Sequence, residues 1–228
     1  MQPLPVPKAM DADDLERVKA SFVRAAEFAI AAGVDGVELH AANGYLLAQF
    51  LNPKSNQRED AYGGNGENRR RFVLEVVDAV AAAIGRERVG IRLSPFNTFN
   101  DLEANYPNEE AELLELVREL SARRLGYLHL IATPGAVPDT TVDAVRAAYA
   151  GRLMLAGDFD RERADAALVA GRADIIAFGR PFIGNPDLPR RLRERLPLAG
   201  FDADALYTPG AKGYSDYADY DALTGVAA

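Results

Sequence analysis

The chain has 228 residues, 48% of them hydrophobic and 8% aromatic, which is typical of a globular protein with one substantial core. Its net charge of −8 argues against nucleic acid or an anionic membrane surface as the main partner, because both require a basic face. There is no cysteine, no signal peptide and no apolar run of about 20 residues; we therefore expect a cytoplasmic protein with no disulfide and no metal site.

Helix and strand are predicted to alternate from the N-terminus onward. After a proline-rich lead-in over residues 1–10, Asp11 is the expected N-cap of a helix that ends before Gly33. The apolar segment 34–41 is the first predicted strand. A polar stretch follows, and then a second helix over about 68–85, where apolar residues recur at intervals of four.

The rest of the chain repeats a unit of one strand followed by one helix. Strands of this length that each precede a helix are typical of βα units and predict a parallel sheet buried on both faces. One leading helix and five such units predict a single α/β domain over 1–228, either an open sheet or part of a (β/α)₈ barrel. The later strands are expected at 89–94, 126–132, 152–157 and 174–179, and the later helices at 108–123, 142–149, from the cap Asp160 onward, and 182–195.

Polar residues at the end of the first predicted strand are candidates for chemistry. His40 closes this strand and Asn43 follows three residues later, so both lie on one face if a helix begins at once. Two neutral donors at this point can hold a carbonyl or nitro oxygen and stabilise charge that develops on it. A core histidine beside an asparagine cap explains the same residues, and spacing alone favours this structural interpretation.

Further candidates lie in the later strands. Arg92 stands inside an apolar strand and therefore needs an ion pair, for example with Glu38, or a ligand. The last two strands each end in a glycine turn, within 155–158 and 178–182. In α/β barrels the loops at this position commonly bind phosphate through backbone N–H groups, and Arg180 adds positive charge. Each turn by itself is more often only a tight βα connection, and the two together favour a phosphate site.

The segment that begins at His40 and ends at Phe72 resembles the signature of the Old Yellow Enzyme family, with matching residues at matching spacings: HAANGYLLAQFLNPKSNQREDAYGGNGENRRRF. The resemblance implies a TIM barrel that uses FMN, with NAD(P)H as hydride donor, to reduce activated C=C bonds in small alkenes. By this resemblance His40 and Asn43 bind the electron-withdrawing oxygen of the substrate. Tyr45 then supplies a proton to the alkene α-carbon, after hydride from the flavin has reached the β-carbon.

The same resemblance assigns residues to the cofactor. Arg92 is expected at the N1/O2 edge of the flavin, where positive charge stabilises the reduced form. Gly157, the backbone of Asp158, Gly179 and Arg180 are expected to hold the FMN phosphate. Many family members have glycine where this chain has Asp158, and a carboxylate repels phosphate unless it points away.

Charged residues of the signature are expected to form one ion-pair network over the site: Arg58, Asp60, Glu67, Arg69 and Arg71.

The resemblance extends to the tail at 207–217 but covers only part of a barrel. Family members begin with three further βα units, on the order of 90 residues at about 30 per unit, so we expect the C-terminal part of a flavin-binding barrel. Because an open sheet leaves two unpaired edges, a homo-oligomer or a complementing chain is expected to close it. The alternative function is an inactive half-barrel that acts only within an assembly. A non-flavin barrel for a phosphorylated metabolite ranks last, because it leaves the signature unexplained.

Overall fold

The computed structural model describes residues 8–225, which contain one parallel sheet with helices packed along it. Its strands are hydrogen-bonded in sequence order, so each lies beside the strand that precedes it in the chain. This order is that of consecutive strands in a (β/α)₈ barrel, and the predicted α/β fold is confirmed. The strands are β1 (Val37–Ala41), β2 (Val89–Leu93), β3 (Tyr127–Ile131), β4 (Leu153–Ala156) and β5 (Ile175–Ile176).

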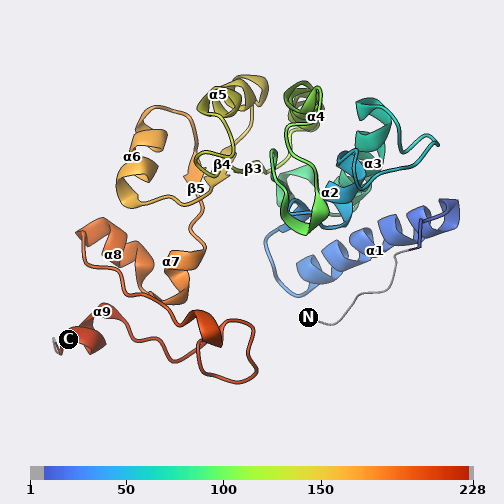
Figure 1. Cartoon of the computed structure of the whole chain (residues 1–228). Helices are drawn as coiled ribbons and strands as arrows, with labels where there is room; N and C mark the ends of the chain where they lie inside the picture. Colours follow the sequence, from blue (N-terminus) through green and yellow to red (C-terminus); the bar gives the residue numbers. More distant parts are fainter. Residues whose placement is uncertain (1–7, 226–228) are drawn as a thin grey trace.

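Figure 1 shows α3, α4, α5 and α6 following one another in an arc around the strands. Helix α1 packs on α3, and α4 packs on both α3 and α5. None of the helices within residues 8–225 is both long enough and apolar enough to cross a membrane. The helices are α1 (Ala12–Ala31), α2 (Leu46–Leu51), α3 (Gly66–Ile84), α4 (Glu109–Arg123), α5 (Asp139–Ala148), α6 (Arg161–Val169), α7 (Arg180–Ile183), α8 (Leu188–Glu194) and α9 (Tyr220–Thr224), with single 3₁₀ turns η1 (Arg86–Arg88), η2 (Phe99–Asp101) and η3 (Ala203–Ala205).

The predicted helix starts at Asp11 and Asp160 are confirmed. The Asp11 carboxylate accepts a hydrogen bond from the backbone N–H of Asp14, whose own carboxylate accepts from the N–H of Asp11, a complete capping box for α1. The Asp160 carboxylate accepts from the N–H of Arg163 at 2.8 Å and caps α6. At the other end of a helix, Gly85 has φ +91° and ends α3 as predicted.

Three helices differ from the prediction. The second long helix, α3, begins before residue 68, because the side chain of Asn65 caps it by accepting from the N–H of Asn68. Helix α5 likewise begins at Asp139 rather than at residue 142. The helix expected over 182–195 is divided into α7 and α8, since the buried Asn185 between them donates to the carbonyl of Pro181 in α7 and to that of Ala199 in the segment after α8.

The two faces of the sheet differ in character. Leu39, Ile91, Leu128 and Leu153 alternate onto the face beneath the helices, and none is more than 4% exposed. The opposite face carries a row of side chains in direct register across four strands: His40, Arg92, His129 and Met154. His40 is exposed and Arg92 is half-buried. His129 on this face is buried. Within the described residues, the prediction of a sheet buried on both faces therefore holds for the face under the helices and only in part for the other.

Candidate active site at the carboxyl ends of the strands

His40, Asn43 and Tyr45 lie together where β1 ends. The condition that a helix begins at once after His40 is not met, because α2 begins only at Leu46. Asn43 instead adopts a left-handed conformation with φ +55°, so a tight turn carries it and Tyr45 stands at the N-cap position of α2. The turn, rather than a helix face, brings the three side chains to one end of the sheet.

Asn43 is held by residues of the loop that follows β2. Its N–H donates to Ser94 Oγ at 2.7 Å, and its carbonyl accepts from Asn100 Nδ2 at 2.9 Å. The side-chain oxygen Oδ1 accepts from Asn97 Nδ2 at 3.1 Å. Since Oδ1 is thereby engaged within the protein, the Nδ2 group of Asn43 is left as a donor toward a ligand.

The imidazole of His40 is likewise oriented by a hydrogen bond within the protein. Its Nδ1 accepts from the N–H of Ala42 at 3.3 Å, so in the neutral ring the proton lies on Nε2, which can donate outward. Burial, and then the positive charge of Arg92, lower the pKa of His40, while Glu38 acts in the opposite direction. The ring of Tyr45 lies 4.9 Å from that of His40, centroid to centroid, and Tyr45 is 52% exposed. A neutral donor thus stands beside an accessible phenol.

Arg92 is the neighbour of His40 on β2, and it has no ion pair among residues 8–225. The alternative of a salt bridge to Glu38 is not formed, because the Glu38 carboxylate instead bonds to His129 Nδ1 at 2.8 Å. Burial raises the pKa of Glu38, but hydrogen bonds from His129 and Tyr127 and the charge of Arg92 lower it overall. The Nε atom of Arg92 is buried without a hydrogen-bond partner in the described part of the chain. Such a donor is suited to a ligand acceptor.

The second group of predicted residues lies after β4 and β5. Gly157 has φ +123°, and a Cβ there would approach the backbone of Ala132 and Thr133 to 2.7 Å, so only glycine fits. Asp158 is also left-handed, with φ +49°, and its carboxylate lies 3.8 Å from Arg180 Nη1. The carboxylate that repels phosphate is therefore matched by an arginine at the start of α7. Gly179 has open space around the position of a Cβ.

Both groups lie at the carboxyl edge of the sheet, as expected for parallel strands. Among residues 8–225, no hydrogen bond or ion pair joins His40, Asn43 or Tyr45 to the residues after β4 and β5. Sequence reasoning missed the support from Ser94, Asn97 and Asn100, although their place at and soon after the end of the predicted strand 89–94 was a usable signal. Arg163, which donates to the carbonyls of Ala132 and Gly157, was not singled out either, because its position inside a predicted helix gave no signal.

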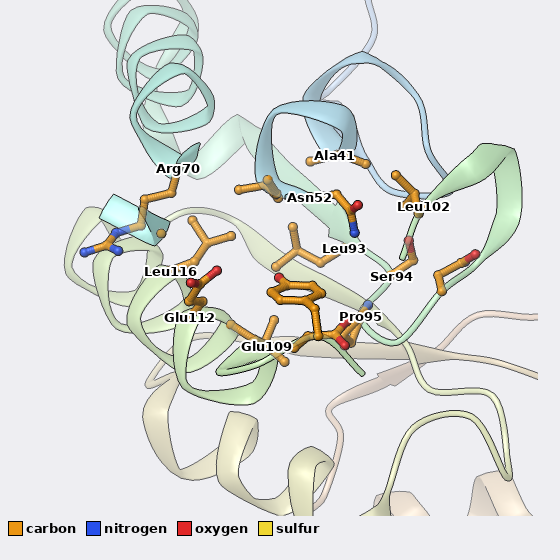
Figure 2. Close-up of a pocket in the computed structure, with 16 residues that line it drawn as sticks. Ala41, Asn52, Arg70, Leu93, Ser94, Pro95, Leu102, Glu109, Glu112 and Leu116 are labelled. Carbon is orange, nitrogen blue, oxygen red and sulfur yellow. The ribbon is translucent and has the colours of Figure 1, made fainter. Parts of the chain in front are cut away.

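Figure 2 shows a cavity on the helix side of this site, between α2, α3, α4 and the loop after β2. At about 80 Å³ it is far smaller than the roughly 300–1,000 Å³ of small-molecule sites. It contains none of the predicted site residues, but Ser94, which holds Asn43, points into it (Figure 2). The cavity is thus part of the support of the site.

In the described part of the chain, no cluster of His, Asp and Glu is arranged to hold a metal ion.

The charged residues of the signature do not form one network, which corrects that expectation. Arg58 pairs with Asp60 at 2.5 Å, and Arg71 lies 3.9 Å from Glu67. Arg69 instead pairs with Glu112 of α4. The signature therefore tightens its own loop through one pair and ties α3 to α4 through another.

Comparison with known proteins places these features in context. The sequence model of the NADH:flavin oxidoreductase / NADH oxidase family matches residues 2–199. A probable flavin mononucleotide-dependent alkene reductase of Leishmania infantum is 44% identical over 95% of this chain. 12-Oxophytodienoate reductase 2 of Arabidopsis thaliana is 41% identical over 92%. The solved structure of morphinone reductase superposes with a TM-score of 0.93 at 41% identity and covers all of this chain.

These matches span only part of each relative. The chain corresponds to 59% of the Leishmania protein, 58% of the Arabidopsis protein and 61% of the morphinone reductase chain. Another structure of morphinone reductase, in complex with tetrahydroNAD, superposes with a TM-score of 0.92. The likeness is one of sequence and of backbone together.

Proposed function

The chain belongs to the NADH:flavin oxidoreductase / NADH oxidase family, the Old Yellow Enzyme family, and from this premise we propose that it binds FMN and serves the reduction of activated C=C bonds. NADH or NADPH is the proposed source of reducing equivalents, supported by the tetrahydroNAD complex of the related morphinone reductase. Small alkenes conjugated to a carbonyl or nitro group are the proposed substrates. We further propose that the chain forms the C-terminal part of the flavin barrel.

The residues of this chain fit FMN. The buried, unpartnered Nε of Arg92 supports a contact with an acceptor on the flavin ring. Gly157 and Gly179 leave room for close approach to backbone N–H groups, which suits a phosphate. Arg180 adds a positive charge there, shared with Asp158. When bound, FMN supplies the hydride for the alkene.

The substrate side of the site would use the three residues after β1. His40 Nε2 and Asn43 Nδ2 are both left as neutral donors by their contacts inside the protein, which supports their binding of a carbonyl or nitro oxygen. Charge that develops on this oxygen is stabilised by such preset donors. Tyr45 is exposed beside His40, which supports its role as the donor of a proton to the alkene α-carbon.

The observation that carries the proposal is Arg92, a half-buried arginine next to His40 that forms no ion pair with any described residue. We expect the purified chain to bind FMN on titration, with the flavin absorption bands, and to reduce cyclohexenone with NADH or NADPH. Arg92→Met should weaken FMN binding by about 10- to 100-fold, the worth of a hydrogen bond to a charged group. Arg193→Met, on the exposed side of α8, is the matched control and should leave the affinity unchanged.

Tyr45→Phe provides the second stage of this test. It should leave FMN binding intact and lower enone turnover by about 100-fold or more, as expected when a general acid is removed. The absence of any flavin-bound species from the unsubstituted chain would overturn the proposed function. An undiminished turnover in Tyr45→Phe would overturn the role of Tyr45 alone.

The second candidate function is that of a half-barrel active only within an assembly. Within residues 8–225, β1 and β5 are each paired on one side only, which favours association with a second copy or a complementing chain. Sedimentation velocity with and without FMN distinguishes the candidates. Flavin bound only by an associated species supports the assembly. A monomer that retains FMN and reduces cyclohexenone contradicts it.

A further inference from the structure

Arg163 joins the two loops that follow β3 and β4. It lies in the first turn of α6, and its guanidinium donates through Nη1 to the carbonyl of Gly157 at 2.5 Å and through Nη2 to the carbonyl of Ala132 at 3.1 Å. The same guanidinium lies over the ring of Phe159, 4.0 Å from the centroid. A bidentate fork stacked on a buried aromatic ring is held in one orientation.

The bond to Ala132 stands where the strand ladder would otherwise continue. The N–H of Ala132 donates to the carbonyl of Ala156 at 2.7 Å, the last backbone bond between the two strands. In a parallel pair the next bond runs back from the residue two positions further on, here from the N–H of Asp158 to the carbonyl of Ala132. That carbonyl is instead occupied by Arg163. Among the described residues the bond from Asp158 is absent, so the ladder ends one bond early.

The early end leaves a set of donors without partners. Among the described residues, the backbone N–H groups of Gly157, Asp158 and Phe159 form no hydrogen bond. Asp158 has φ +49°, a left-handed conformation that costs free energy in a residue other than glycine and therefore needs support from its surroundings. Arg163 of α6 contacts the residue on each side of Asp158, the carbonyl of Gly157 and the ring of Phe159, and these contacts stabilise the conformation of Asp158.

We propose that Arg163 is a positioning residue for the phosphate of FMN: by occupying the carbonyls of Ala132 and Gly157, it keeps the N–H groups of residues 157–159 free for the phosphate, which it does not itself touch. The inference rests on the proposed function, since it takes FMN as the ligand. The positive charge of Arg163, next to these amides, also favours the binding of an anion.

Paired titrations with FMN and riboflavin, which lacks the phosphate, test this role. Arg163→Met should weaken FMN binding about tenfold or more while riboflavin binding changes less than about twofold. Arg163→Lys keeps the charge but cannot reach two carbonyls as a fork, so it should restore only part of the loss. Arg161→Met is the matched control, because Arg161 lies on the same helix and donates to the carbonyls of Leu192 and Arg193 instead.

A second readout does not depend on any flavin. In Arg163→Met the N–H of Asp158 can take the vacated carbonyl of Ala132, so its hydrogen exchange should slow, whereas mere loosening of the loop would speed it. If Arg163→Met does not fold, the FMN-to-riboflavin ratio of Arg163→Lys decides the matter. Equal affinity of the unsubstituted chain for FMN and riboflavin would overturn the phosphate site and this role together. A preserved ratio in both Arg163 variants, with FMN still preferred by the unsubstituted chain, would overturn this role alone.

Discussion

Arg92 and His40 occupy facing positions on adjacent strands, and each alters the surroundings of the other. Burial and the charge of Arg92 keep the imidazole neutral to a lower pH than usual. A neutral ring whose Nδ1 already accepts from Ala42 has one defined donor, Nε2. Burial is the main cause of the lowered pKa of His40, and the charge of Arg92 adds to it.

The pKa of His40 can be measured directly, because the chain has only two histidines. NMR titration of the imidazole signals should place it below the ordinary value of 6.5, and Arg92→Gln should raise it by removing a positive neighbour. Arg88→Gln, at the opposite end of β2, is the control and should leave it unmoved. A His40 that titrates at 6.5 or above in the unsubstituted chain would contradict the assignment.

The same shift predicts a pH dependence of stability. Since the folded pKa lies below the unfolded one, the unfolded chain binds more protons between the two values, and unfolding becomes easier as the pH falls. The contribution of His40 is complete above pH of about 6.5 and is lost as the pH drops through the lowered value. A histidine with a carboxylate partner has the opposite effect, because its raised pKa makes its contribution to stability fall as the pH rises.

At the scale of elements, the glycine turns after β4 and β5 resemble each other in sequence but differ in structure. Gly157 has positive φ and no room for a Cβ beside Ala132, whereas Gly179 has φ −103° and open space. One turn is thus dictated by packing between two loops. The other is free to accept a side chain as far as the protein itself is concerned.

Alanine at each position separates these cases. Gly157→Ala should lower the free energy of unfolding by about 2–4 kcal/mol, because it combines backbone strain with a clash against backbone atoms. Gly179→Ala should change it by less than about 1 kcal/mol. Urea denaturation measures both. A loss of similar size in the two variants would show that the close approach at Gly157 is not what restricts it.

Elements with strong local signals were predictable and short ones were not. The caps at Asp11 and Asp160 act within one turn of the chain, so their sequence pattern suffices. Helix α2 has six residues and α7 has four, too few to show a helical period. The break between α7 and α8 depends on Asn185 meeting Ala199, a contact that no local pattern records.

At the scale of the whole molecule, Arg69 links three separate segments. It donates to the carbonyls of Leu51 and Gly64 and pairs with Glu112, and its side chain is only 7% exposed. The end of α2, the signature loop and α4 therefore meet at one buried cation. Because Arg69 satisfies acceptors from distant parts of the chain, its loss should lower the free energy of unfolding of the whole protein.

Arg69→Met should lower the free energy of unfolding by about 2–4 kcal/mol, since it leaves a partly buried carboxylate and two carbonyls without their donor. Arg118→Met removes an arginine whose pair with Glu115 is more than half exposed, and should cost less than about 1 kcal/mol. Thermal and denaturant unfolding of both variants provide the comparison. Equal losses would mean that burial of the Arg69 pair has no special effect.

The sequence by itself determined the succession of βα units and the family, and it supplied the candidate site residues, because periodicity, caps and the signature are local properties of the chain. The tertiary structure alone decided what those side chains meet. Within residues 8–225, it paired Glu38 with His129 and left Arg92 without an ion pair. It also placed Asp158 beside Arg180, and bonded Arg163 to the carbonyl of Ala132 where the strand ladder ends. These outcomes depend on register and packing between segments far apart in the chain, and no local pattern specifies such distances.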